Sequence, residues 1–238
     1  MTPLDRLRIE KAATDCGFEM TPLERDGGLE LRSARFPETV LVEPTTSSTL
    51  RVSAARAVLL DSVDGAGIVV VSGFGALYDV LRTAAAHART LPNRVADAFL
   101  RETAGMPKAT EAERLVVERV GQGLFRGALL DYWQGKCCVT GLDVPVLLRA
   151  SHIRPWAHCE TDEQRLDVFN GLLLAPHLDA LFDAGFMTVA DDGTVMLAAA
   201  LSIDQLQKLG LTRDLAVHGL RAEHLKYLGF HRRSVWRS

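Results

Sequence analysis

Two aspartates at helical spacing suggest the first piece of chemistry in this sequence. Asp179 and Asp183 lie four residues apart in a segment with Pro176 near its start and Gly185 just after its end, which is typical of a short helix. On such a helix the two carboxylates lie one above the other on one face. Alone they repel each other by roughly 0.2–0.5 kcal/mol, whereas a divalent cation between them makes the pair favourable. The pair is therefore a candidate metal clamp, and plain surface charge is the alternative.

A histidine further upstream could act with such a cation on a phosphodiester. In its neutral form the imidazole of His152 can deprotonate a water molecule for attack on phosphorus. A cation held by Asp179 and Asp183 can act as a Lewis acid that stabilises the phosphorane and the departing 3′-oxygen. All-oxygen ligation favours Mg²⁺, with Mn²⁺ as a substitute, over Zn²⁺. These residue types can therefore supply the chemistry of metal-dependent phosphodiester hydrolysis.

The elements around His152 must bring it to the aspartates. Two apolar runs, near 137–140 and 146–153, flank a Gly/Asp/Pro turn, which predicts a β-hairpin with His152 near the end of its second strand. A loop with Asn170 follows before the short helix. Ahead of the hairpin, a capping box at Thr110 predicts the start of a helical lead-in. We expect two helical segments there, Glu111–Val120 and Leu124–Trp133, linked around the glycines at 121 and 123.

The first hundred residues have a different pattern, which predicts a separate module. Helical periodicity is expected over Leu4–Cys16, Phe74–Ala86 and Pro92–Glu102, and short strands over Leu29–Leu31, Val40–Val42, Leu50–Val52 and Ile68–Val71. The pattern breaks at Gly105–Ala109. The fold class is therefore α+β, with a small N-terminal α+β domain over 1–107 and a second domain over 108–238 that ends in a helical extension.

Three motifs in the second domain resemble the HNH endonuclease family. They are Ser151-His152-Ile153-Arg154-Pro155-Trp156, Asn170-Gly171-Leu172-Leu173-Leu174 and Leu181-Phe182-Asp183-Ala184-Gly185. Their order matches the bacterial branch of the family, and the resemblance covers roughly residues 110 to 190. It implies a ββα-metal nuclease domain that cuts DNA.

The resemblance also implies a role for each matching residue. His152 takes the place of the general base, and Asn170 takes that of the residue that holds the loop and hairpin. Asp179 stands where the family often has a metal-binding His, and Asp183 matches a second helix ligand. Ser151 is the third candidate metal-site residue. It departs from the pattern, because many members have an Asp or His metal ligand there and serine offers only a hydroxyl.

Further residues near the motifs are weaker candidates. Arg126, Arg149 and Arg154 are the expected phosphate contacts, because a guanidinium matches a phosphate with two donors, and an ordinary surface role is the alternative. His177 lies two positions before Asp179, about 200° round the helix, so we expect it not to bind the metal. Cys159 is close to the base in sequence, but without Cys-x₂-Cys spacing a structural Zn²⁺ is not expected.

Composition limits the kind of protein that carries this motif. Of 238 residues, 47% are hydrophobic and 24% charged, as in ordinary globular proteins, and the net charge of −3 does not by itself indicate a nucleic-acid binder. No apolar run approaches the roughly 20 residues of a membrane helix. Few, irregularly spaced cysteines, with Cys137 and Cys138 adjacent on an expected strand and pointing to opposite faces, do not suggest a disulfide framework. We expect a cytoplasmic protein with no membrane partner.

Three functions remain open on the sequence. The first is a restriction or defence endonuclease for double-stranded DNA, whose N-terminal domain recognises the target with arginines of its sheet: Arg32, Arg35, Arg51 and Arg56. The second is a DNA-binding protein on a degenerate HNH scaffold. The third is a nuclease effector gated by a ligand or partner that the N-terminal domain senses. A homodimer is an open option, because two active sites can cut two strands, but the sequence indicates no interface.

Overall fold

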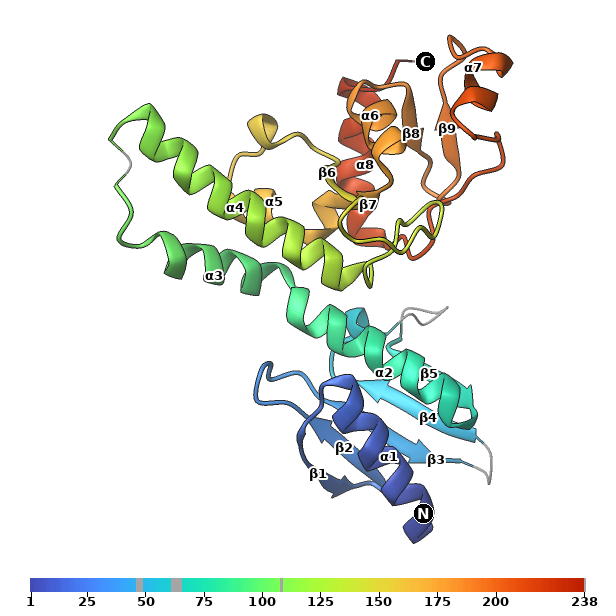
Figure 1. Ribbon diagram of the computed structural model, residues 1–238. Helices are drawn as coiled ribbons and strands as arrows, with labels where there is room; N and C mark the ends of the chain where they lie inside the picture. The colour runs from blue at the N-terminus through green and yellow to red at the C-terminus, as the bar shows by residue number, and fades with distance from the viewer. Residues whose placement is uncertain (46–48, 61–65, 108, 238) are drawn as a thin grey trace. The chain divides into compact units, whose positions relative to one another are not determined.

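The computed structural model describes residues 1–45, 49–60, 66–107 and 109–237. The chain divides into two compact units, Met1–Arg89 and Thr90–Ser238, and each contains helices and strands, so the fold is α+β (Figure 1). Within the described ranges, no helix is both long enough and apolar enough to cross a membrane.

The first unit is an antiparallel sheet with two helices on one face. Its elements are α1 (Pro3–Cys16), β1 (Met20–Arg25), β2 (Gly28–Arg32), β3 (Val40–Pro44), β4 (Thr49–Ala54), the 3₁₀ turn η1 (Ala57–Leu59), β5 (Ile68–Ser72) and α2 (Gly73–Thr90). The strands lie in chain order, each antiparallel to the next. Alternate strand residues such as Leu29 and Leu31 are buried in one core with Ile9 of α1 and Leu81 of α2, so both helices cover the same face (Figure 1).

The second unit surrounds a small ββα arrangement with helices. Its elements are α3 (Pro92–Thr103), α4 (Glu111–Tyr132), β6 (Arg149–His152), η2 (Trp156–His158), α5 (Asp162–Leu166), η3 (Val168–Asn170), β7 (Gly171–Leu174), α6 (Pro176–Asp183), β8 (Met187–Val189), β9 (Val195–Leu197), α7 (Ile203–Lys208) and α8 (Ala222–Ser234). Helix α4 packs against α3, α5 and both strands of the ββα arrangement, whereas α8 packs against β8 and η3 (Figure 1). The strands β6 and β7, followed by α6, confirm the predicted ββα order.

The predicted hairpin is wrong in its pairing. Residues 137–148 form turns and irregular backbone, and β6 instead pairs antiparallel with β7, with His152 opposite Gly171. Every residue of β7 is buried, so this strand needs a partner for its backbone groups. The stretch 137–148 is a poor partner, because Gly141 has a positive φ of 71° and Pro145 lacks a backbone donor. The expected position of His152 at the end of a strand is confirmed.

The expected break in the lead-in helices is also wrong, because α4 is one continuous helix. Gly121, which the sequence predicts in a linker, is buried inside α4. A Cβ at this position would lie 2.8 Å from the Trp156 ring and 3.2 Å from the Phe99 ring. This glycine allows close packing, which outweighs its unfavourable helix propensity.

The helix α3 belongs to a different part of the chain than the sequence predicts. The sequence pattern assigns Pro92–Glu102 to a domain over 1–107. In the structure α3 lies in the unit that begins at Thr90 and packs against α4 and α5. The turn at Gly105 separates α3 from α4, and these two helices pack together. The break in the sequence pattern there is a turn between two helices of one unit.

Candidate active site

One cavity of about 310 Å³ lies at the end of β6 in the second unit. Its walls come from β6, the segment after it, α6 and the C-terminal helix: Ala150, Ser151, His152, Pro155, Trp156, Asp183, His231 and Val235. Three residues predicted from the sequence, Ser151, His152 and Asp183, therefore share one cavity. Asp179 lies one turn away from Asp183 on α6, and neither Asn170 nor His177 lines the cavity.

His152 is held by a hydrogen bond and by a stacked aromatic ring. Its Nε2 lies 2.8 Å from the carbonyl oxygen of Arg165, and its ring stacks on Phe125 with centroids 3.8 Å apart and planes at 12°. A carbonyl oxygen only accepts, so Nε2 donates, and the neutral ring keeps its lone pair on Nδ1. Burial lowers the pKa of His152, while the carbonyl contact opposes this shift. The imidazole is therefore neutral at pH 7.

Helix α6 presents the two aspartates next to Ser151. The Ser151 hydroxyl donates to Asp183 Oδ1 at 3.2 Å and lowers the pKa of Asp179, against the larger effect of burial. Burial raises the pKa of both carboxyls, and the charge of Asp179 raises that of Asp183 further, against the Ser151 hydrogen bond. The apolar side of the helix buries Leu178, Leu181 and Phe182. The ionised pair is thus destabilised unless a positive charge neutralises it.

The donor atoms at this position fit a hard divalent cation. Asp179 and Asp183 offer carboxylate oxygens and Ser151 offers a hydroxyl oxygen. Over the described ranges, no three or more His, Cys, Asp or Glu side chains gather in a way that could hold a metal. Mg²⁺ is commonly held by one or two carboxylates with water and substrate phosphate, whereas structural Zn²⁺ takes four nitrogen or sulfur ligands. These side chains therefore fit Mg²⁺ or Mn²⁺.

Asn170 is fully buried, and its amide bonds the loop after β6. Its Oδ1 accepts from the backbone N–H of Arg154 at 2.7 Å, and its Nδ2 lies 3.2 Å from the Arg154 carbonyl and 3.0 Å from that of Gln164. Gln164 directly precedes Arg165, whose carbonyl holds His152. The contacts of Asn170 therefore fix the loop that follows His152.

Two of the three predicted phosphate-binding arginines are bound to the protein itself. Arg126 donates through Nη1 to the Leu148 carbonyl at 2.7 Å and through Nη2 to the Pro145 carbonyl at 2.8 Å. Arg154 forms an ion pair with Glu160 at 2.9 Å. Arg126 thus fixes the segment that leads into β6.

Arg149 is the exception among the three arginines. It is exposed at the start of β6, and its charge lowers the pKa of Asp179, against the larger effect of burial. Its guanidinium has no hydrogen-bond partner among the residues that the structure describes. Arg149 is therefore the arginine best placed to meet a phosphate near the aspartates.

The adjacent cysteines lie in a turn, so the expectation that they point to opposite faces of a strand is wrong. Both Cys137 and Cys138 are buried free thiols. The Sγ of Cys137 accepts from the backbone N–H groups of Thr140 at 3.4 Å and Ala175 at 3.3 Å. This contact ties the turn to the residue that caps α6, because Ala175 is its N-cap.

Sequence reasoning missed three groups that surround the site. The helical spacing of Phe125 and Leu129 identifies a buried face of α4, but it cannot show that Phe125 stacks on His152. The carbonyl of Arg165 has no sequence signal, because any residue can supply a carbonyl. His231 lies in a helix far from the motifs, between Phe230 and Arg232, where nothing in the sequence indicates a part in the site.

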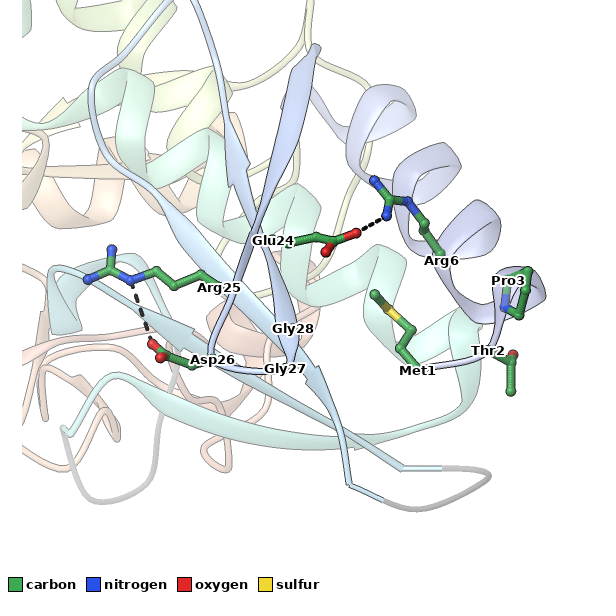
Figure 2. A pocket seen from close by; sticks show the side chains of 9 residues that line it. All are labelled: Met1, Thr2, Pro3, Arg6, Glu24, Arg25, Asp26, Gly27 and Gly28. Carbon is green, nitrogen blue, oxygen red and sulfur yellow. Dashed lines mark hydrogen bonds and ion pairs between the residues drawn. The ribbon is translucent and has the colours of Figure 1, made fainter.

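A larger hollow lies in the first unit, between the first turn of α1 and the turn between β1 and β2 (Figure 2). Its volume is about 530 Å³, and none of the residues predicted to do chemistry lines it. Arg6 pairs with Glu24, and Arg25 lies 3.6 Å from Asp26, so the charged side chains of this hollow pair with one another (Figure 2).

Comparison with known proteins gives one family. A family model described as HNH endonuclease matches residues 137–190, which contain β6, β7 and α6 with Ser151, His152, Asp179 and Asp183. No curated protein matches the chain. The match confirms the resemblance seen in the three motifs and indicates nuclease activity on nucleic acid. Residues 137–190 of this chain are therefore similar to the HNH endonuclease family.

Proposed function

We propose that this domain hydrolyses phosphodiester bonds of double-stranded DNA with the help of a divalent metal ion and with His152 as the general base. The observation that carries the proposal is that a neutral His152 and the Asp183 carboxylate line one cavity. Phosphodiester hydrolysis needs a base for the attacking water and a charge partner for the phosphate, and these two residues can provide both.

The surroundings of His152 suit proton transfer at Nδ1. With Nε2 donating to the Arg165 carbonyl, Nδ1 is the nitrogen that can take a proton from water. The stacked Phe125 ring keeps solvent from one face of the imidazole and restricts its rotation. Once the ring is protonated, the Arg165 carbonyl accepts a stronger, charge-assisted hydrogen bond and stabilises the imidazolium. The base thus has a fixed tautomer and orientation before substrate binds.

Asp179 and Asp183 are the proposed metal holders. Their raised pKa values support this role, because both burial and mutual repulsion oppose their ionisation in the free protein. When bound there, Mg²⁺ or Mn²⁺ supplies Lewis-acid stabilisation of the charge on the phosphorane and the leaving oxygen. The Ser151 hydroxyl donates to Asp183 and so orients that carboxylate.

A rival proposal starts from Ser151, which stands where many family members have a metal ligand. In that case the chain binds DNA without cutting it. The hydrogen bond of Ser151 to Asp183 favours an intact site, because a decayed one has no reason to keep two carboxylates together that burial destabilises.

Plasmid cleavage separates these proposals. Supercoiled plasmids from differently methylated hosts, incubated with Mg²⁺, Mn²⁺ or EDTA, are expected to be nicked or linearised only with metal. A gel shift without cleavage under any metal would instead support the DNA-binding protein. Different cleavage of the differently methylated plasmids would support a restriction-type enzyme that reads its target.

Salt dependence separates the proposed phosphate contact of Arg149 from the structural contact of Arg126. Arg149→Gln is expected to weaken DNA binding and to reduce the slope of log K against log salt by about 1, because one phosphate contact is lost. Arg126→Gln is the matched control, because its guanidinium already bonds two carbonyls. This variant is expected to lower thermal stability and to keep the wild-type slope. Equal slopes for Arg149→Gln and the wild type would remove Arg149 from the interface.

For the N-terminal domain, predicted over 1–107, we propose target recognition, with ligand or partner sensing as the alternative. Its independent core in the unit Met1–Arg89 supports a separate role. Two of its candidate arginines have acidic neighbours, with Arg51 3.5 Å from Glu43 and Arg56 3.7 Å from Glu38. In both pairs the arginine is exposed, whereas Glu38 is buried and Glu43 is half-buried, so the arginines can also reach a phosphate.

A further inference from the structure

The C-terminal helix α8 (Ala222–Ser234) forms part of the cavity, although it lies outside the residues that the family model matches. His231 lies on its last turn, and Val235 is its C-cap. Both line the cavity with His152 and Asp183. A helix beyond the ββα arrangement therefore supplies part of the wall of the site.

His231 is buried and uses both ring nitrogens. Its Nε2 lies 3.1 Å from the carbonyl oxygen of Phe182, and its Nδ1 lies 2.9 Å from Thr188 Oγ1. The carbonyl only accepts, so Nε2 donates to it, and Nδ1 accepts from the Thr188 hydroxyl. Burial lowers the pKa of His231 to about 4, so the ring is neutral at pH 7 and keeps this pattern.

The partner of His231 directly precedes Asp183 in the last turn of α6. Carbonyls in a last turn lack helical partners, and helix ends fray unless other groups bind them. The Phe182 carbonyl accepts from the Gly185 N–H at 3.0 Å as well as from His231. The Phe182 ring also stacks on the His231 ring, with centroids 3.9 Å apart and planes at 13°. His231 thus holds both the backbone and the side chain next to Asp183.

The residues after α8 hold the turn that follows α6. Gly185 has a φ of 76°, and its carbonyl accepts from the Arg237 N–H at 2.9 Å. A Cβ on Gly185 would overlap the carbonyl oxygen of Val235. The end of α6 is therefore enclosed by the C-terminal segment on the side of this turn.

We propose that His231 is a positioning residue for the Asp183 carboxylate, acting through its hydrogen bond to the Phe182 carbonyl. The inference rests on the proposed function, in which Asp183 holds the metal ion. A fixed last turn keeps Asp183 against the Ser151 hydroxyl and ready for the cation. Groups that orient metal ligands in this way commonly change metal affinity by about 10–100-fold when they are removed.

Two substitutions test the hydrogen bond separately from the packing. His231→Phe keeps an aromatic ring against Phe182 but removes both hydrogen bonds, whereas His231→Gln restores a donor near the position of Nε2. Calorimetric titration with Mn²⁺ is expected to show at least about tenfold weaker binding for His231→Phe and a loss within about threefold for His231→Gln. Plasmid cleavage by His231→Phe is expected to recover as Mn²⁺ is raised, which a general loss of structure does not produce.

Arg232→Gln is the matched control on the same helix. Arg232 donates to the Val189 carbonyl and pairs with Asp191, away from α6. Its replacement is expected to lower the melting temperature and to leave Mn²⁺ affinity unchanged. If His231→Phe does not fold, Thr188→Val, which removes the hydroxyl that holds the ring, replaces it in the titration and is expected to weaken Mn²⁺ binding.

The Asp183→Asn variant distinguishes the two ways in which the inference can fail. If Asp183→Asn loses Mn²⁺ affinity while His231→Phe, or Thr188→Val in its place, binds like the wild type, His231 has no positioning role and the proposed function stands. If neither variant loses affinity, Asp183 does not hold the ion, and both proposals are overturned.

Discussion

The His152→Ala variant is expected to cleave plasmid DNA roughly 10²–10⁴-fold more slowly than the wild type, the range that a general base contributes. The substitution removes the only group that we propose to take the proton of the attacking water. DNA affinity is expected to stay near the wild-type value, because the neutral ring carries no charge toward phosphate. Single-turnover cleavage with saturating enzyme measures the first effect, and a gel shift without metal measures the second.

His158→Ala is the matched control for this experiment. His158 is an exposed histidine on η2, six residues after the base, and it does not line the cavity. Its replacement is expected to leave cleavage unchanged. Circular dichroism of the His152 variant checks that loss of the stacking with Phe125 has not unfolded the domain. Wild-type cleavage by a folded His152→Ala protein would rule out His152 as the base.

Asp179→Asn and Asp183→Asn are each expected to weaken Mg²⁺ binding by more than the roughly 10–100-fold that orienting groups contribute. The double variant is expected to bind Mg²⁺ little more weakly than the single variant with the larger loss of affinity, because both carboxylates act on one ion. Calorimetry and the rise in melting temperature on adding Mg²⁺ both measure this affinity. Asp204→Asn, at an exposed position on α7, is the control and is expected to bind Mg²⁺ like the wild type.

The same substitutions are expected to raise the stability of the metal-free protein. The pKa values of Asp179 and Asp183 are higher in the folded state than their ordinary values. Folding therefore disfavours the charged forms, with no penalty below the unfolded-state pKa and a full penalty above the folded-state pKa. At pH 7 the penalty is present, and a neutral amide avoids it. Equal melting temperatures without metal, together with unchanged Mg²⁺ affinity, would place the metal elsewhere, with His177 as the next candidate.

Local sequence patterns predicted most regular elements correctly. The strands β2 and β4 alternate apolar and polar residues, and β3 and β5 contain short apolar runs. The helices α1, α2 and α3 show helical spacing. Strand β1 was missed because five of its six residues are exposed and it contains Pro22. An edge strand with so few buried side chains shows almost no alternation of apolar and polar residues in the sequence.

The sequence also determined which side chains form the core of the site. His152 at the end of a strand, and Asp179 with Asp183 one helical turn apart, follow from local spacing, and the order of the three motifs identifies the family. These properties depend on neighbours within a few residues, which a single sequence displays directly. The sequence does not show the pairing of β6 with β7, because this pairing joins segments about twenty residues apart. It depends on which strand most needs a buried partner.

Only the tertiary structure decided how the site is tuned. In the folded chain, Nε2 of His152 lies against the Arg165 carbonyl, and His231 lies against Phe182. Arg126 binds the backbone before β6, whereas Arg149 is exposed. These contacts join groups from separate elements. Several of the acceptors are backbone carbonyls, which every residue has and which the sequence therefore cannot distinguish. Local sequence patterns therefore identify the candidate residues of the site. Their protonation, orientation and accessibility depend on packing between elements that are distant along the chain.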